Sequence, residues 1–165
     1  MTASTAAISA SRLLSTLTGS ATTPLSLVPP FSKASAEVKV KKAQDLWNTK
    51  DPAKAALAYT PDSVWRNRDD FFQGREAIER FLTSKWEKET QYKLRKRLFA
   101  FEGNRIAVQF WFVISSRNIS LGTFDPEGLM QKRHCSANEV AVGEEERWFK
   151  EGVDVDLVEI SERDG

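Results

Sequence analysis

Two arginines on separate predicted strands offer the clearest chemistry in this sequence of 165 residues. Arg66 lies in the predicted strand 63–68, and Arg133 lies in the predicted strand 129–136, where it shares a face with Gln131. A guanidinium group presents a fixed fork of donors that suits a carboxylate or a phosphate. We therefore expect Arg66, Gln131 and Arg133 to contact a small anion inside a cavity.

Strand alternation is the reason for placing both arginines inside. Successive side chains of a strand point to opposite faces, so Arg66 shares a face with Val64, and Arg133 shares one with Cys135. Desolvating a guanidinium group without a partner costs several kcal/mol, so two inward arginines need acids nearby or a bound anion. The acidic pair 69–70 at the end of the first strand could instead hold Arg66, and this structural alternative stays open.

Aromatic residues could form the apolar part of the same site. The sequence contains ten Phe, five Trp and two Tyr, which is enough for a core and for cavity walls. Small-ligand pockets are mostly apolar with a few polar groups, so we expect Phe72, Trp86 and Phe110 to form the walls. The alternative is that the tryptophans Trp47, Trp65 and Trp86 belong to the hydrophobic core.

The single histidine and the single cysteine exclude several common active sites. Because His134 and Cys135 are the only residues of their kinds, an intrachain disulfide, a cysteine zinc cluster and any mechanism with two histidines are ruled out. The two residues are adjacent in a predicted strand, so their side chains point to opposite faces and do not form a dyad. We predict no metal site and no cofactor.

A basic run at 93–97 is typical of a nucleic-acid surface. It contains Lys93, Arg95, Lys96 and Arg97. These residues mostly share one strand face, no RNA or DNA motif accompanies them, and the net charge of the chain is only +1. We therefore expect a solvated outer face and no nucleic-acid partner.

Three helices are predicted before most of the strands. Apolar residues recur at helical spacing along 36–47, after a candidate N-cap at Ser35. Asp51 followed by Pro52 is the signature of an N-cap and the first position of a short second helix. The third helix is predicted over 75–87, with one apolar stripe and a polar opposite side.

Strands dominate the rest of the chain. A long strand is predicted over 92–100. The next strand has one wholly apolar face, which must point inward; its residues are Ile106, Val108, Phe110, Phe112 and Ile114. Helices followed by strands in succession predict an α+β fold with an antiparallel sheet, rather than a doubly wound parallel fold. No apolar run approaches the ~20 residues of a membrane span, so we expect no membrane partner.

The two ends of the chain differ from its middle. Residues 1–30 are rich in Ser, Thr and Ala with Arg12 as their only charge, and we interpret them as a disordered extension. The expected location is the cytoplasm; the alternative is a mitochondrial transit peptide, because no acidic residue precedes Glu37. We predict one domain over 31–150 and an acidic tail over 151–165.

Five segments carry a resemblance to a known superfamily. The longest is AYTPDSVWRNRDDFFQGREAI at 58–78, and the others lie at 43–52, 81–86, 103–108 and 125–133. On these residues the chain resembles the nuclear transport factor 2-like superfamily, with its SnoaL-like cone fold, and within it a domain-of-unknown-function branch. The resemblance implies three N-terminal helices packed on a cone-shaped, curved antiparallel sheet that encloses a pocket.

The resemblance implies no single reaction, because the superfamily holds isomerases, dehydratases, cyclases and non-catalytic binding proteins. Its steroid isomerases place a catalytic carboxylate at the position that matches Arg66 or Asn67 here, and neither is a base at neutral pH. We predict a protein that binds a small, anionic, partly apolar ligand in its cone. A lyase, isomerase or hydrolase acting on a small metabolite there, and a non-catalytic homodimerisation module, stay open.

One segment departs from the superfamily branch. Relatives carry a longer hairpin between the positions that match Phe112 and Thr123, where this chain has only the ten residues 113–122. We expect a shortened strand, an unpaired sheet edge and poor packing there, with a loss of stability. Asn118 begins an Asn-Ile-Ser sequon, which we interpret as a chance match because no secretory signal accompanies it.

Overall fold

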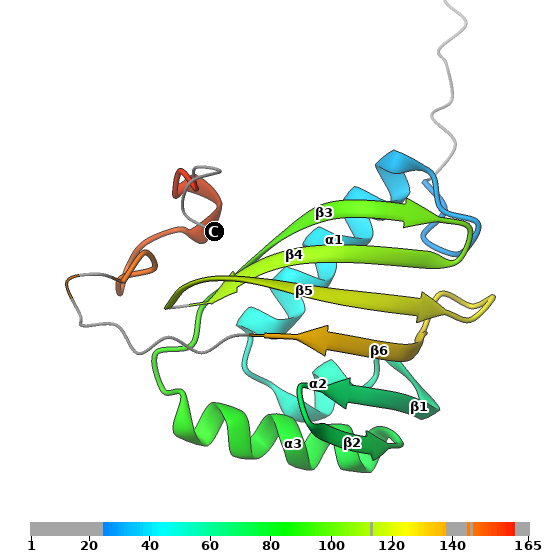
Figure 1. The fold of residues 1–165 in the computed structure, drawn as a ribbon, viewed down its shortest axis with the longest axis horizontal. Helices are drawn as coiled ribbons and strands as arrows, with labels where there is room; N and C mark the ends of the chain where they lie inside the picture. The colour runs from blue at the N-terminus through cyan, green and yellow to red at the C-terminus, as the bar shows by residue number, and fades with distance from the viewer. Residues whose placement is uncertain (1–24, 113, 138–144, 146, 161–165) are drawn as a thin grey trace, which may run out of the picture.

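The computed structural model describes residues 25–112, 114–137, 145 and 147–160 (Figure 1). Its elements are α1 (Lys33–Asn48), α2 (Pro52–Ala56), β1 (Tyr59–Asn67), β2 (Asp70–Gln73), α3 (Arg75–Lys88), β3 (Leu94–Glu102), β4 (Arg105–Phe112), β5 (Ile114–Phe124), β6 (Met130–Ser136) and the 3-10 helix η2 (Val155–Leu157). The three α-helices in the described part of the chain all precede β3, as predicted.

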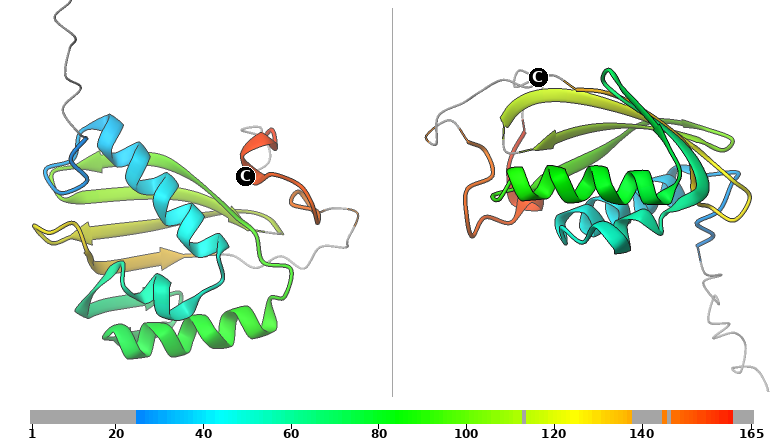
Figure 2. Two further views of the ribbon diagram at one scale, coloured as in Figure 1. Left: turned by 180° about the vertical axis from the view of Figure 1, so that it is seen from behind. Right: turned by 90° about the horizontal axis from the view of Figure 1, so that it is seen from below.

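Six strands form one curved sheet in the order β2-β1-β6-β5-β4-β3. Neighbouring strands run antiparallel, except for β1 and β6, which run parallel. The helices cover the concave face of this open sheet (Figure 2). The predicted α+β cone is therefore confirmed, with one parallel pair that the expectation of an antiparallel sheet did not include.

The first two helices begin at side-chain caps. Ser32 and Ser35 form a capping box at the start of α1, so Ser32 is the N-cap in place of the expected Ser35. Asp51 caps α2 by accepting a 3.0 Å hydrogen bond from the backbone N–H of Lys54, and Pro52 takes the first helical position as predicted. Both caps satisfy backbone donors that a helix start otherwise leaves without partners.

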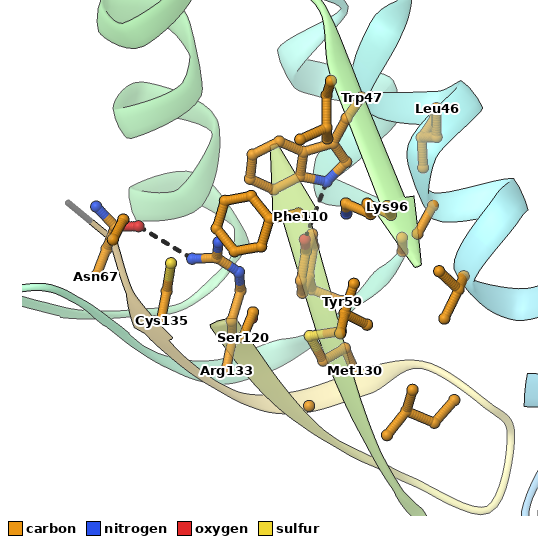
Figure 3. Close-up of a pocket in the computed structure, with 18 of the residues that line it drawn as sticks. Leu46, Trp47, Tyr59, Asn67, Lys96, Phe110, Ser120, Met130, Arg133 and Cys135 are labelled. Atoms are coloured by element: carbon orange, nitrogen blue, oxygen red, sulfur yellow. Dashed lines mark hydrogen bonds between the residues drawn. The ribbon is translucent and has the colours of Figure 1, made fainter. Parts of the chain in front are cut away.

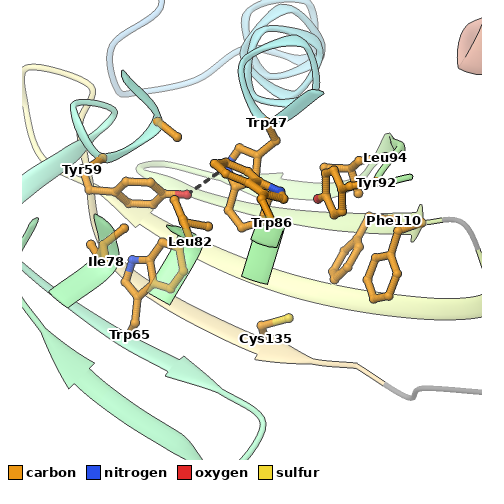
Figure 4. Packing of buried hydrophobic residues seen from close by; sticks show 13 residues of the cluster. Trp47, Tyr59, Trp65, Ile78, Leu82, Trp86, Tyr92, Leu94, Phe110 and Cys135 are labelled. Atoms are coloured by element: carbon orange, nitrogen blue, oxygen red, sulfur yellow. Dashed lines mark hydrogen bonds between the residues drawn. The ribbon is translucent and has the colours of Figure 1, made fainter. Parts of the chain in front are cut away.

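The main core lies between the helices and the sheet and is rich in tryptophan (Figure 4). Trp47 of α1 stacks on Trp65 of β1, with ring centroids 6.1 Å apart, and meets Trp86 of α3 edge-on at 6.0 Å. All three side chains are buried. The interpretation of Trp65 and Trp86 as core residues is therefore confirmed, whereas Trp47 belongs to the core and also lines the cavity.

The stretch 114–122 lies partly inside the sheet. Residues 114–122 belong to β5, which pairs with β4 on one side, and of this stretch 119–122 also pair with β6 on the other. Asn118 is buried and its side-chain amide donates to the carbonyl oxygen of Phe110 at 3.4 Å, so the sequon lies inside the fold. The expected unpaired edge is absent at 119–122, which lie inside the sheet, whereas in the described pairing 114–118 have no partner on the side of β6.

Part of the predicted acidic tail packs on the sheet. Phe149 and Val155 are buried against Trp111 on the outer face of β4. Arg95 of β3 donates to the carbonyl oxygens of Val155 at 2.8 Å and Val158 at 2.6 Å. The packed body therefore extends past the predicted domain boundary as far as η2, where the sequence shows little periodicity.

The end of the predicted N-terminal extension also has a defined place. Phe31 is buried and meets Phe124 of β5 edge-on at 5.2 Å, and Leu27 lines the main cavity. Residues 1–24 lie outside the described residues, so the predicted disorder there stays a prediction. In the part of the chain that the structure describes, no helix has the length and apolar character needed to cross a membrane.

Candidate ligand pocket

A cavity of about 670 Å³ lies between the concave face of the sheet and the helices (Figure 3). Its lining comes from α1 and α3 and from every strand of the sheet. The predicted inward face of β4 is part of it, with Ile106, Val108, Phe110 and Phe112. The volume lies within the range of ~300–1,000 Å³ that is typical of small-molecule sites.

Arg66 does not reach this cavity. On β1, Trp65 is fully buried and Asn67 lines the cavity, so Arg66 between them points to the outer face. Its Nε donates to the carbonyl oxygen of Arg68 at 3.0 Å, and its guanidinium lies 5.6 Å from the ring centroid of Phe71. The expected inward placement is wrong, because burying an indole stabilises the fold more than burying a valine, and the alternation of β1 follows Trp65.

Arg133 does face the cavity, and a bulge in β6 decides this. Thr123 of β5 pairs with Lys132, but the next residue, Phe124, pairs with Met130. Gln131 is therefore the extra residue of a bulge in β6. Met130 and Arg133 line the cavity, whereas Gln131 is exposed. The expected contact of Gln131 with the cavity is therefore wrong, because the bulge interrupts the alternation between it and Arg133.

Arg133 is surrounded by aromatic rings and one amide. It is 6 % exposed, and its Nη1 donates to Oδ1 of Asn67 at 3.1 Å. The guanidinium carbon lies 4.5 Å from the ring centroid of Trp65 and 5.3 Å from that of Trp47. No Asp or Glu among the described residues is at ion-pair distance from it. Most of its five N–H donors thus remain available to a ligand.

Lys96 brings a second cation into the cavity. It shares the inward face of β3 with Leu94 and Leu98, and its Nζ lies 4.7 Å from the ring centroid of Trp47. Burial, assisted by the positive charge of Arg133, lowers the pKa of Lys96 to about 7. The expectation that Lys96 belongs to a solvated outer face is wrong, and its position in step with two leucines was the signal in the sequence.

The rest of the basic run lies away from the cavity and holds neighbouring segments. Lys93 donates to the carbonyl oxygen of Val153 at 2.7 Å, close to the bonds from Arg95 to the C-terminal segment. Arg97 donates to Oε1 of Gln109 at 2.8 Å on the outer face of the sheet. These cations pack the end of the chain and the outer face of the sheet, so this surface is less solvated than expected.

Of the three predicted aromatic walls, Phe110 lines the cavity. Phe72 stacks on Phe81 with ring centroids 5.0 Å apart, and Trp86 meets Tyr92 edge-on at 5.9 Å. Both belong to the main core cluster or pack against it and do not line the cavity. Phe72 and Trp86 therefore serve as core residues here and are not walls of this cavity.

Two polar groups in the cavity were not predicted as site residues. The Tyr59 hydroxyl accepts a 3.3 Å hydrogen bond from Nε1 of Trp47, and burial raises the pKa of Tyr59. No pattern in the sequence marked Tyr59 as a site residue. Asn67 holds Arg133 and is the inward member of the pair that matches the steroid isomerases' carboxylate position, so a neutral amide stands there.

The acidic side chains beside the cavity do not neutralise Lys96 or Arg133. Glu89 pairs with Lys85 at 2.5 Å, and Asp70 is exposed. Among the described residues, no group of three or more His, Cys, Asp or Glu side chains could hold a metal ion. Lys96 and Arg133 therefore contribute positive charge to the inner surface that no described carboxylate compensates.

A family model described as "Protein of unknown function (DUF1348)" matches residues 29–150. No curated protein matches the chain.

Solved structures share the fold at low sequence identity. A SnoaL-like protein of unknown function from Burkholderia thailandensis is 12% identical, with 65% of this chain and 98% of that chain covered and a TM-score of 0.60. SalBIII, an epoxide hydrolase/cyclase-like enzyme with a role in forming the pyran ring of the polyether salinomycin, is 16% identical to this chain. The match covers 63% of this chain and 91% of SalBIII, with a TM-score of 0.55. A cystatin-like-fold protein from Methylobium petroleophilum is 20% identical, with 68% and 82% covered and a TM-score of 0.53. These matches confirm the expected SnoaL-like fold.

Proposed function

This chain belongs to the DUF1348 family, and we propose that it binds a small anion with an apolar body in the cavity of its cone. One observation carries the proposal: Arg133 and Lys96 both reach the cavity, and none of the described carboxylates pairs with them. Burying a cation without a partner costs several kcal/mol, and a bound carboxylate or phosphate would offset that cost. The anionic ligand expected from Arg66 and Arg133 is thus supported with Lys96 in place of Arg66.

The arrangement of the cations suits a ligand with a flat apolar part. Trp47 contacts both cations, since its ring lies 4.7 Å from Lys96 Nζ and 5.3 Å from the Arg133 guanidinium carbon. Phe110 and Met130 add apolar surface on the sheet side of the same space (Figure 3). A carboxylate held by Arg133 would leave the apolar body against these side chains.

Calorimetric titration of 3-phenylpropanoate against its neutral amide tests the proposal. We expect the acid to bind and the amide to bind much more weakly, because only the acid offers a charge to the cations. Arg133→Met should lower the affinity for the acid about a hundredfold, since it removes one partner of a desolvated charge pair. Arg66→Met is the matched control and should bind as the unchanged protein does.

Equal binding of the acid and the amide, or an unchanged affinity in the Arg133→Met variant, would contradict the proposal. Native mass spectrometry of the protein from its own cells then identifies the natural ligand by its mass. The same spectra distinguish a monomer from the homodimer that the sequence left open.

An enzyme acting in the same cavity is the second candidate. The specific observation in its favour is Lys96, an amine in an apolar site whose pKa burial lowers to about 7, near the value that suits proton transfer at neutral pH. The likeness to SalBIII, described as an epoxide hydrolase/cyclase-like enzyme, supports it only through the shared fold. Turnover of a library of carboxylic acids by the pure protein, lost in the Lys96→Met variant, would separate an enzyme from a binding protein.

A further inference from the structure

Lys96 differs from Lys39 and Lys85, which also line the cavity, in having no acceptor for its amine in the described part of the chain. Lys85 pairs with Glu89 at 2.5 Å, and Lys39 donates to the carbonyl oxygen of Gly128 at 2.5 Å. In the described part of the chain, neither a hydrogen bond nor an ion pair reaches Lys96 Nζ, and its contact is with the face of an aromatic ring. The amine is therefore directed at the cavity without being held in place by a carboxylate or carbonyl.

The surroundings also favour the neutral form of this amine. Apolar walls desolvate it, the positive charge of Arg133 repels its proton, and together they lower the pKa of Lys96 to about 7. At pH 7 an ordinary lysine is neutral in fewer than about one molecule in a thousand, whereas this amine is neutral in a large fraction. A desolvated lysine beside another cation is a recurrent way to obtain a nucleophilic amine at neutral pH.

We propose that Lys96 is the nucleophile of a Schiff-base site that takes an aldehyde or ketone bearing a carboxylate. The carboxylate lies on Arg133, the carbonyl carbon faces Lys96 Nζ, and the apolar body lies against Trp47 and Phe110. This inference rests on the proposed binding of an anion in the cavity and adds the chemical class of that ligand.

The reaction balances without an oxidant, a reductant or a cofactor. The lone pair of Lys96 Nζ forms a bond to the carbonyl carbon while the π electrons of the carbonyl move to its oxygen, which takes up a proton as the nitrogen loses one. The resulting carbinolamine loses its hydroxyl group and a second nitrogen proton as one water molecule. The product is an imine between the lysine and the ligand.

Tyr59 is placed to assist the proton steps. Its hydroxyl accepts from Trp47 Nε1 at 3.3 Å, and the ring of this same tryptophan lies under Lys96 Nζ, so the indole brings hydroxyl and amine to one part of the cavity. Because the hydroxyl oxygen receives the indole N–H, its own proton can be donated to the oxygen of a bound carbonyl group. The raised pKa of Tyr59 keeps this proton in place at neutral pH.

Reductive trapping tests the proposal in the full-length protein. The carbonyl probes are phenylpyruvate and 4-carboxybenzaldehyde, each incubated with sodium cyanoborohydride, followed by peptide mapping. We expect a secondary amine adduct at Lys96, at least about tenfold above that at any other lysine, because a desolvated neutral amine reacts before protonated ones. Arg133→Met should reduce the adduct by weakening capture of the carboxylate.

Controls separate this inference from the proposed function. The probes without a carbonyl group, 3-phenylpropanoate and 4-methylbenzoate, report binding alone. The Lys96→Arg variant should give no adduct, while Lys85→Arg should give the full adduct. Binding of these acids without selective trapping of either carbonyl probe overturns the Schiff-base site and leaves anion binding standing. Failure of all four probes to bind overturns both.

Discussion

Arg95 and Lys96 are adjacent on β3, and the sheet places them in opposite situations. Arg95 is met by the carbonyl oxygens of Val155 and Val158 outside the cavity, whereas Lys96 meets only the face of Trp47 within it. The first cation is satisfied by the protein itself and fastens the C-terminal segment. The second has no hydrogen-bond acceptor among the described residues, and burial lowers its pKa to about 7. In this fold, the lack of a partner distinguishes a side chain available to a ligand from one that holds the structure together.

The largest effect is expected from Arg95→Met, which removes the satisfied cation. The substitution leaves two carbonyl groups without their charged donor, and hydrogen bonds to charged groups contribute ~1.5–3 kcal/mol each, so the free energy of unfolding should fall by about 3 kcal/mol. Urea unfolding measures the loss, and limited proteolysis should show faster cleavage within 147–160.

Arg105→Met is the matched control for this change. Arg105 makes a 2.8 Å ion pair with Glu102, and both side chains are more than half exposed. Surface pairs of this kind contribute ~0–1 kcal/mol, so the control should barely change the unfolding free energy. Similar losses in the two variants would mean that the C-terminal segment is not fastened through Arg95.

A smaller, pH-dependent effect is expected from Lys96→Met. The pKa of Lys96 is about 7 in the folded chain against an ordinary value of 10.5, so between these values the unfolded state binds more protons than the folded state. The unchanged protein should therefore gain stability over the variant as pH rises through this window, by about 1 kcal/mol per pH unit.

Urea titrations of both proteins at several pH values from 6 to 9 measure this difference. Below the folded pKa the buried charge is fully present, so the variant, which keeps most of the side-chain volume, should there be the more stable protein. A stability difference that does not change with pH would contradict the placement of the Lys96 amine in a desolvated site.

The smallest effects are expected at the two residues that were predicted to line the cavity and lie outside it in the structure. Arg66 and Gln131 are exposed, so Arg66→Met and Gln131→Ala should each change the unfolding free energy by less than about 0.5 kcal/mol. Neither variant should alter binding of 3-phenylpropanoate. A loss of binding in either one, measured by calorimetry, would show that the outer face takes part in recognition.

The sequence was sufficient wherever a local pattern decides the structure. The cap at Asp51 and the apolar face from Ile106 to Phe112 are fixed by neighbours close in the chain, and both were predicted correctly. The inward direction of Arg133 was also predicted, although the bulge beside it was not. The α+β class followed from the order of the predicted helices and strands, and the cone shape followed from the resemblance.

The site was predicted less completely because several of its side chains are placed by long-range competition. On β1 the sequence alone allows either Arg66 or its neighbours Trp65 and Asn67 to face inward. The large indole of Trp65 takes the core position, and Arg66 therefore points outward. On β3 the charge of Lys96 suggested solvent, while its step with Leu94 placed it inside. The packing of Phe149 and Val155 on Trp111 joins segments distant in sequence, and no periodicity announces such a contact.

The bulge at Gln131 acts as a phase shift in the strand. Upstream of it an even-numbered residue, Met130, faces the cavity, and downstream the odd-numbered Arg133 and Cys135 do. Which side chains of β6 face the cavity therefore depends on the number of residues before the bulge as well as on their chemical types. In a sequence alignment with a relative, a one-residue gap at the bulge exchanges the residues that face the cavity with those that face outward. An arginine aligned with Lys132 can then be the true counterpart of Arg133, while one aligned with Arg133 itself points to solvent.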